Sequence, residues 1–209
     1  MSNITIIIPS RLNAERLPNK PLKLINKKEM ILHVYDSAKK SNVGEVIVAT
    51  PDQKIFDLIK HHNGLAVLTT DKHETGTDRV FEVFKKKLKF VPEIIINFQG
   101  DMPNLDAQAI KDLAEHMKKK LCDIGTLASS IENKHEEKDP NVVKVLVDRD
   151  IKNRSFAKAI DFFRISNKPL SKHTYHHVGI YAFTNKALIR YVSLERSKLE
   201  IERKLEQLR

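Results

Sequence analysis

Short runs rich in β-branched residues alternate with longer segments of helical period along the first part of the sequence. Met30 to Ser41 carries apolar residues at Ile31, Val34, Tyr35 and Ala38, which is the spacing of one helix face. Strand-like runs occupy Glu45 to Thr50, Leu65 to Leu68 and Glu93 to Phe98. Strands that alternate with helices form parallel sheets with right-handed crossovers. The alternation therefore predicts a Rossmann-like α/β fold, with a mostly parallel sheet and helices on both faces.

The later strand-like runs follow one another without full-length helices between them. They lie at Val142 to Val147, Ser155 to Phe163 and His177 to Phe183. Such a succession favours mixed or antiparallel pairing. We therefore expect residues 1–209 to form one domain, with a mixed extension at about residues 132–183 that carries an acceptor pocket or a dimer surface.

The composition limits the classes of partner and compartment. The formal net charge of +10 suits an anionic partner such as a nucleotide, a nucleic acid or a membrane surface. Cys122 is the only cysteine, so no internal disulfide can form, and a reducing cytoplasmic setting is expected. No apolar run approaches the roughly 20 residues of a membrane-spanning helix. The sequence thus predicts a cytoplasmic protein without a membrane span.

The first strand-like run leads directly into a cationic loop that contains Arg11, Arg16 and Lys20. In an open α/β sheet, ligands bind beyond the carboxyl ends of the strands, so this loop is a candidate floor for phosphates. It lacks the glycines of a P-loop, and side chains would therefore grip the phosphates as much as backbone amides would. The simpler alternative is that any one of these cations is merely solvated.

A second candidate site follows the run Glu93 to Phe98, which is apolar enough for a central strand. Gln99, Gly100 and Asp101 come directly after it. A glycine would let the backbone bend sharply there, and the Asp101 carboxylate could hold a divalent cation over a triphosphate. The alternative is a structural aspartate in a turn.

Two helix starts are marked by capping residues. Asp52 is expected to cap the helix that follows the strand Glu45 to Thr50. The polar loop Thr69 to Arg79 feeds another helix, expected to begin at about Thr77. A helix N-terminus there could face an anion. Simple capping is the favoured interpretation of this loop, because threonine and aspartate are common at helix starts.

Five segments occur in a fixed order: IIIPSRLNAERLPNKPL, ETGTDRV, NFQGDMP, HHVGIY and LEQLR. In this order and at about this spacing they resemble the family of 3-deoxy-manno-octulosonate cytidylyltransferases, the CMP-Kdo synthetases of lipopolysaccharide assembly. The resemblance covers nearly the whole chain. It implies a nucleotide-diphospho-sugar transferase fold, a homodimer, and a reaction in which CTP and the sugar acid Kdo give CMP-Kdo and pyrophosphate with Mg²⁺ as cofactor.

The resemblance also implies roles for residues of this chain. Arg11, Lys20 and Asp101 would be catalytic, and Asp101 would bind Mg²⁺. The nucleotide would be bound by Ser10, Arg11, Arg16, Lys20, Thr75, Gly76, Thr77, Arg79 and Gln99. The sugar acid would be bound by Lys158, His177, Tyr181, Glu206 and Gln207.

The chain departs from the family pattern in three places. Phe156 to Phe162 reads FAKAIDF where the family usually has Phe-Ser-Arg-x-x-Ile-Pro, so the Lys158 ammonium replaces a planar guanidinium. Arg203 stands where family members commonly have glutamate. Family members also continue beyond LEQLR, where they supply a second metal-binding aspartate, and the chain is expected to lack that segment. The helical pattern through Leu205 and Leu208 is expected to run to the end of the sequence.

Two other functions remain open on the sequence. The altered stretch Phe156 to Phe162 permits another acid sugar, such as 8-amino-Kdo, sialic acid or a related nonulosonate. The basic composition also permits a nucleic-acid-binding protein. Against the latter, only 6% of residues are aromatic, and the cations are spread along the chain without a recognisable nucleic-acid motif.

Overall fold

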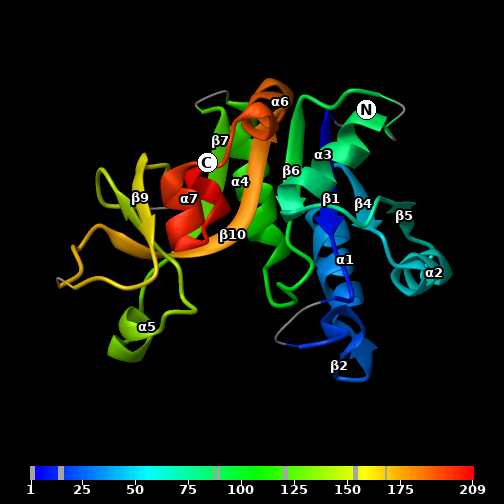
Figure 1. The fold of residues 1–209 in the computed structure, drawn as a ribbon, viewed down its shortest axis with the longest axis horizontal. Coiled ribbons are helices and arrows are strands. Elements are labelled where there is room, and N and C mark those ends of the chain that lie inside the picture. The colour runs from blue at the N-terminus through cyan, green and yellow to red at the C-terminus, as the bar shows by residue number, and fades with distance from the viewer. Residues whose placement is uncertain are drawn as a thin grey trace. The chain divides into compact units, whose positions relative to one another are not determined.

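The computed structural model describes residues 3–13, 17–86, 88, 90–119, 122–152, 155–167 and 169–209. Their contacts divide the chain into two compact units (Figure 1). The first comprises the described residues of Met1–Gly125 and Ile180–Val192, and the second those of Thr126–Gly179 and Ser193–Arg209. Within the described part of the chain, no helix is both long enough and apolar enough to cross a membrane.

Four parallel strands form the centre of the first unit. They are β1 (Ile4–Pro9), β4 (Glu45–Thr50), β5 (Leu65–Leu68) and β6 (Ile94–Phe98), in the spatial order β5-β4-β1-β6. The C-terminal half of β10 (Thr174–Thr184) adds an antiparallel strand beside β6, with Ile180 opposite Phe98. Every residue of β1 is buried, as expected for a central strand that is covered on both faces.

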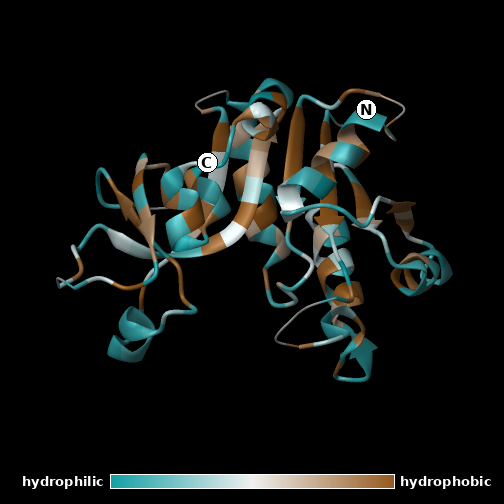
Figure 2. Cartoon of the chain, in the orientation of Figure 1, coloured by the Kyte–Doolittle hydropathy of each residue, from teal (hydrophilic) through white to brown (hydrophobic). Residues whose placement is uncertain are grey.

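Helices cover both faces of this sheet, which confirms the predicted architecture. They are α1 (Met30–Ser41), α2 (Gln53–His61), α3 (Gly76–Lys86), α4 (Ala107–Lys118) and α6 (Asn185–Ser193). On one face, Val80 of α3 and Leu188 of α6 join Ile7 and Ile95 in a single buried cluster. On the other, α1 and α4 pack against each other and against β4 and β6. Figure 2 shows the central strands as mostly brown, hydrophobic segments, and the helices around them with hydrophilic and hydrophobic residues in alternation.

Three short elements follow the first loop. A 3-10 turn, η1 (Lys20–Leu22), leads into a small hairpin of β2 (Leu24–Ile25) and β3 (Lys28–Glu29). Pro21 is the buried residue of the turn. The turn brings the chain back to the start of α1, where the Met30 N–H donates to the carbonyl oxygen of Lys23.

The second unit is built on antiparallel strands, as the sequence predicted. β8 (Lys144–Val147) pairs on one side with β9 (Ala159–Phe163) and on the other with the N-terminal half of β10. β7 (Ile124–Ser129) also pairs with β10. The unit is completed by α5 (Lys134–Lys138), α7 (Lys198–Arg203) and the 3-10 turn η2 (Glu206–Leu208).

The prediction of one continuous helix at the end of the sequence is wrong. α7 ends at Arg203, because Lys204 takes the left-handed backbone conformation with φ of 53° and ψ of 47°. The break turns Leu205 into the interior, where only 3% of its surface is exposed. It also brings Arg209 back to Glu200, whose carboxylate is fully buried and accepts from the Arg209 guanidinium at 3.1 Å. Burial and this ion pair outweigh the local helical pattern.

Candidate active site

The first loop is anchored where it leaves β1. The Ser10 N–H donates to the carbonyl oxygen of Ala49 on β4, and the Leu12 N–H donates to the Asp52 carboxylate at 2.8 Å. Asp52 occupies the N-cap position of α2, but its side chain does not cap that helix, so the predicted capping role is wrong. The carboxylate instead holds the first loop in place beside Arg11, through its hydrogen bond with the Leu12 N–H. Arg16 lies outside the described residues.

Two adjoining hollows open at the carboxyl ends of β1 and β6. The His73 hollow, of about 190 Å³, is lined by Pro9, Ser10, Arg11, His73, Glu74, Thr75, Gly76, Arg79 and Gln99. The Lys20 hollow, also about 190 Å³, is lined by Pro9, Ser10, Arg11, Lys20, Pro21, Met30, Gln99, Gly100 and Asp101. They share Ser10, Arg11 and Gln99, so both candidate regions found in the sequence border one another. This is the edge of the sheet where ligands of α/β folds bind.

Lys20 and Asp101 contact each other directly in the Lys20 hollow. Their Nζ and Oδ2 atoms lie 2.7 Å apart, and the two side chains are 35% and 52% exposed. An ion pair this exposed contributes little to stability, typically about 0–1 kcal/mol. Asp101 can therefore exchange Lys20 for another cation, and Lys20 can turn to an anion, at small energetic cost.

Gly100 serves this site through its small size. Gly100 lies in a turn, as expected, although no glycine in the described part of the chain has a positive φ. A Cβ at this position would lie 2.9 Å from the carbonyl oxygen of Pro9 and 3.2 Å from the Cβ of Ser10. The missing side chain allows the ends of β1 and β6 to approach closely, which holds Ser10 and Asp101 in one hollow.

Capping chemistry organises the start of α3, as the sequence predicted. The Thr75 N–H and hydroxyl both donate to the Asp78 carboxylate, at 3.1 and 2.8 Å, and the Asp78 N–H donates back to the Thr75 hydroxyl. This reciprocal arrangement is a capping box. The helix begins at Gly76, one residue before the expected start. Thr75 and Gly76 line the His73 hollow, so capping and a place in the candidate site coexist.

Thr77 is a buried residue that supports the site through hydrogen bonds. Only 1% of its surface is exposed, and its hydroxyl accepts a hydrogen bond from the Asn97 side chain at 3.0 Å. Asn97 in turn accepts from the Gln99 amide at 3.3 Å. Thr77 was expected among the nucleotide-binding residues, but its side chain faces the interior and orients Gln99 through Asn97.

Arg79 is a buried cation at the wall of the His73 hollow. It is 3% exposed, and its Nη1 donates to the Thr69 hydroxyl and, at 2.9 Å, to the carbonyl oxygen of Thr70. Burial lowers the pKa of the guanidinium, and the positive charge of Arg11 lowers it further. Arg11 also lines the Lys20 hollow, so an anion held there would ease the repulsion between the two cations.

Sequence reasoning missed the group opposite Arg79. Glu82, only 9% exposed, accepts hydrogen bonds from the Thr70 N–H at 3.0 Å and from His73 Nε2 at 2.6 Å. Burial by itself raises the pKa of Glu82, but the hydrogen bonds from His73 and Thr70 bring it below the ordinary value, so the group is ionised at neutral pH. The available signal was the spacing of Arg79 and Glu82, which places two charges one turn apart on α3.

The residues expected to bind the sugar acid are divided between the two units. Lys158, His177, Glu206 and Gln207 belong to the second unit, whereas Tyr181 belongs to the first. Tyr181 is 7% exposed, and its ring packs in the hydrophobic cluster beside Phe183. For all five residues, sugar binding stays a prediction.

Two departures from the family pattern meet in the second unit. Arg203 donates to the Asp161 carboxylate at 2.6 Å and to the carbonyl oxygen of Phe162 at 2.7 Å. These contacts tie α7 to β9 across 42 residues of sequence. The guanidinium in place of the usual glutamate thus has a carboxylate partner from the altered stretch Phe156 to Phe162.

His177 is a buried, neutral histidine. Its Nε2 lies 2.9 Å from the Thr126 hydroxyl, and the edge of its ring packs against Phe162 at a centroid distance of 5.0 Å. Burial, together with the charge of His176, lowers the pKa of His177 from 6.5 to about 4. At neutral pH this side chain can hydrogen-bond but contributes no charge toward a carboxylate.

The second unit is expected to lose stability in mild acid because of His177. Its folded pKa of about 4 is below the unfolded value of 6.5, so unfolding takes up a proton between these pH values. Stability is complete above pH 6.5 and falls by about 3 kcal/mol as the pH approaches 4. Urea unfolding of the wild type and of His177→Gln at pH 7.5, 5.5 and 4.5 measures this loss of unfolding free energy. Equal pH slopes for the two proteins would contradict it.

Comparisons with known proteins place the chain among cytidylyltransferases. The family model described as Cytidylyltransferase matches residues 5–209. The 3-deoxy-manno-octulosonate cytidylyltransferase of Paramagnetospirillum magneticum is 39% identical over 208 residues, which cover 98% of this chain and 83% of the relative. That of Rhodospirillum centenum is 39% identical, with 99% of this chain and 80% of the relative covered.

Solved structures give the same result. A CMP:2-keto-3-deoxy-manno-octonic acid synthetase complexed with CTP is 36% identical with a TM-score of 0.84, over 98% of this chain and 83% of that one. A 4-diphosphocytidyl-2C-methyl-D-erythritol synthase from Anaerococcus prevotii has a TM-score of 0.61 over 98% of this chain and 83% of that one, at 14% identity. The second likeness concerns the fold alone, which is a nucleotidyltransferase fold.

Proposed function

Because the chain belongs to the cytidylyltransferase family, together with the 3-deoxy-manno-octulosonate cytidylyltransferases, we propose that it transfers the cytidylyl group of CTP to Kdo. The products are CMP-Kdo, the activated sugar acid used in lipopolysaccharide biosynthesis, and pyrophosphate. The observation that carries the proposal is the pair of adjoining hollows that share Arg11 and Gln99. The family favours this enzyme over the nucleic-acid-binding alternative.

The residues of the Lys20 hollow suit phosphoryl transfer. The anomeric hydroxyl of the sugar acid attacks the α-phosphorus of CTP, and pyrophosphate leaves in line. Negative charge increases on the pyrophosphate oxygens as the bond breaks, and Arg11 and Lys20 are the cations available to stabilise it. Gln99, held by Asn97, orients the nucleotide between the two hollows.

Mg²⁺ is the proposed cofactor, and Asp101 is its proposed protein ligand. Mg²⁺ typically uses one or two carboxylates and completes its shell with substrate phosphates and water. The Lys20 hollow offers one carboxylate, that of Asp101, whose weak pairing with Lys20 supports an exchange for a metal ion. Bound there, the ion would supply charge neutralisation for the triphosphate.

A cytoplasmic homodimer is the proposed form of the enzyme. The single cysteine, Cys122, fits a reducing compartment, which is also where CTP is available. The second unit exposes Ile160 on β9 to 60% and Ile201 on α7 to 57%, and apolar side chains of this kind favour association. Light scattering that gives the mass of a monomer at micromolar concentration would count against the dimer.

Acceptor comparison tests the reaction. The chain is incubated with CTP and Mg²⁺, and in parallel with Kdo, 8-amino-Kdo or sialic acid, and pyrophosphate and product mass are measured. We expect Kdo to give CMP-Kdo and pyrophosphate, and EDTA to stop the reaction. If another acid sugar is turned over and Kdo is not, the proposed cytidylyl transfer stands but the proposed acceptor is wrong. Binding of CTP without turnover of any acid sugar would overturn the proposal.

A further inference from the structure

We propose that His73 selects cytosine over uracil in the nucleotide, and that Glu82 positions His73 for this task. The inference rests on the proposed function, because it assigns the His73 hollow to the base of CTP. It concerns residues for which the sequence motifs implied no role.

The loop that carries His73 is held by two buried charges of α3. The Glu82 carboxylate accepts from both the N–H and the hydroxyl of Thr70, each at 3.0 Å, and Arg79 donates to the Thr70 carbonyl oxygen at 2.9 Å. Glu82 and Arg79 are 9% and 3% exposed. Both backbone polar groups of Thr70 are therefore bound by buried side chains of α3, although Thr70 itself is exposed. A wall fixed in this way loses little entropy when a ligand binds.

The contact with Glu82 also determines which ring nitrogen of His73 carries a proton. His73 Nε2 lies 2.6 Å from Glu82 Oε2, and its side chain is 13% exposed. An ionised carboxylate only accepts hydrogen bonds, so Nε2 is the donor. In the neutral imidazole, Nδ1 is then an acceptor. His73 lines the hollow, and in this tautomer Nδ1 is the one acceptor atom of its ring.

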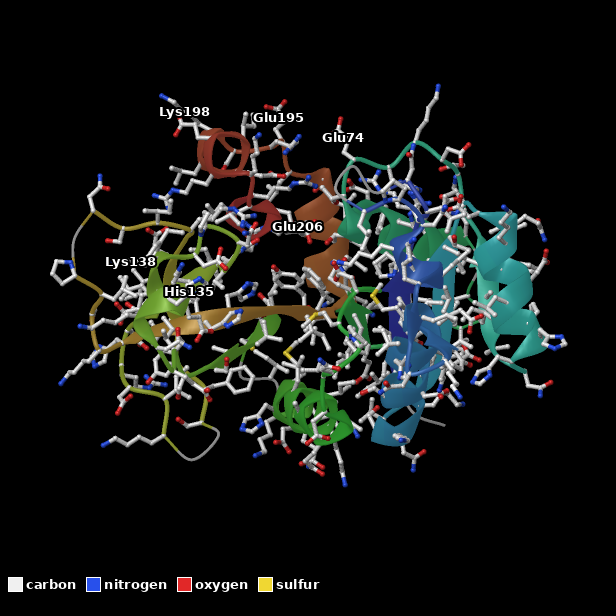
Figure 3. All side chains as sticks on the ribbon, turned by 90° about the horizontal axis from the view of Figure 1, so that it is seen from below. Glu74, His135, Lys138, Glu195, Lys198 and Glu206 are labelled. Carbon is white, nitrogen blue, oxygen red and sulfur yellow. The ribbon has the colours of Figure 1, made fainter. Side chains whose placement is uncertain are left out.

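Charge separates the two hollows. The negative Glu82 carboxylate contacts His73 directly, which disfavours a phosphate at that end of the His73 hollow. Arg11 lines both hollows, whereas Lys20 lines only the neighbouring one. Glu74 also belongs to the lining, but its side chain is exposed and projects outward from the loop before α3 (Figure 3). The triphosphate therefore fits the Lys20 hollow and the base fits the His73 hollow.

Gly76 lies close to the Gln99 amide at the wall of this hollow. A Cβ there would lie 3.1 Å from both polar atoms of the Gln99 amide and 3.3 Å from Pro9. The absent side chain allows this close approach of the loop to Gln99. Cytosine carries an amino donor at the ring position where uracil carries a carbonyl acceptor. An acceptor at His73 Nδ1 pairs with the first and opposes the second.

Two matched pairs of variants test this selection in the full chain. In His73→Gln, the amide reaches the position of Nε2 and can keep the contact with Glu82, but nothing replaces Nδ1. In His73→Asn, the amide replaces Nδ1 and loses the contact with Glu82. Glu82→Ala releases His73, whereas Glu82→Gln retains an acceptor oxygen. For each variant, kcat/KM with Kdo and Mg²⁺ and the calorimetric Kd are measured for CTP and for UTP.

We expect the CTP-to-UTP ratio to fall at least about 10-fold in His73→Gln and in Glu82→Ala, and to stay within about threefold of wild type in Glu82→Gln. His73→Asn should lie between these limits, because it keeps an acceptor but loses the contact with Glu82. If His73→Gln weakens the binding of CTP and UTP equally and leaves the CTP-to-UTP ratio unchanged, His73 has only a structural role. The Kd values separate the two proposals. A wild type that binds CTP selectively through His73 but turns over no acid sugar overturns the proposed function and leaves this inference standing. A wild type that binds CTP and UTP equally overturns the inference.

Discussion

Replacement of Asp101 by alanine is expected to lower pyrophosphate release from CTP and Kdo by roughly 10²- to 10³-fold. The carboxylate directly follows β6, lines the Lys20 hollow and lies 2.7 Å from Lys20. Its loss removes the proposed metal ligand and leaves Lys20 without its counter-ion in this hollow. Steady-state assays over a range of Mg²⁺ concentrations measure the effect, and high Mg²⁺ should restore only a small part of the rate.

A matched control separates this effect from a general change of charge. Asp57 lies on the exposed side of α2, where its carboxylate accepts from Gln53 at 2.7 Å. Asp57→Ala changes the net charge by the same amount as Asp101→Ala and should keep the wild-type rate within about twofold. Equal activity of Asp101→Ala and Asp57→Ala would remove Asp101 from the mechanism.

Replacement of Gly44 by alanine should give the largest loss of stability in the first unit, about 3 kcal/mol or more. A Cβ on Gly44 would lie 1.9 Å from the carbonyl oxygen of Ile4 and 2.7 Å from its carbonyl carbon. Both are backbone atoms of β1, whose neighbours β4 and β6 hold it in register. The strand must therefore shift within the sheet, and the whole central sheet is strained. Urea unfolding followed by circular dichroism measures the free energy of unfolding.

Gly179 provides the matched substitution. It is also a glycine without positive φ, and no heavy atom lies within 4 Å of the Cβ that alanine would add. Gly179→Ala should change the free energy of unfolding by no more than about 0.5 kcal/mol. Similar losses of unfolding free energy in the two variants would mean that the close contact between Gly44 and β1 does not determine the stability of the sheet.

Local sequence rules worked where the relevant partners lie within one turn or one strand. The helix over Met30 to Ser41 and the strand over Glu45 to Thr50 are found with the expected bounds. The Thr75 and Asp78 capping box was likewise foreseeable, because its two residues are three positions apart. Ser10, Arg11, Gln99 and Asp101 could be placed together because parallel strands end at the same edge of the sheet.

Local rules failed where a distant partner changed the role of a residue. Asp52 looks like a helix cap, but the N–H of Leu12, 40 residues earlier in the chain, takes its carboxylate. Gly100 forms the turn that local rules predict, but they did not predict that its small size also allows the close approach of Pro9 across the sheet. Leu205 looks like the next turn of a helix, but burial draws it inward. Each of these roles depends on a contact or on burial that exists only after the strands and helices have assembled.

The sequence by itself determined the order of strands and helices, the cationic first loop and the carboxylate after β6, because apolar periodicity and residue type act locally. The five ordered motifs also indicated the family that the comparisons show. Only the tertiary structure decided that Arg79 and Glu82 bind Thr70, that His73 contacts Glu82, and that Arg203 pairs with Asp161. These contacts join segments from different elements, and their energy depends on burial that no stretch of sequence has alone.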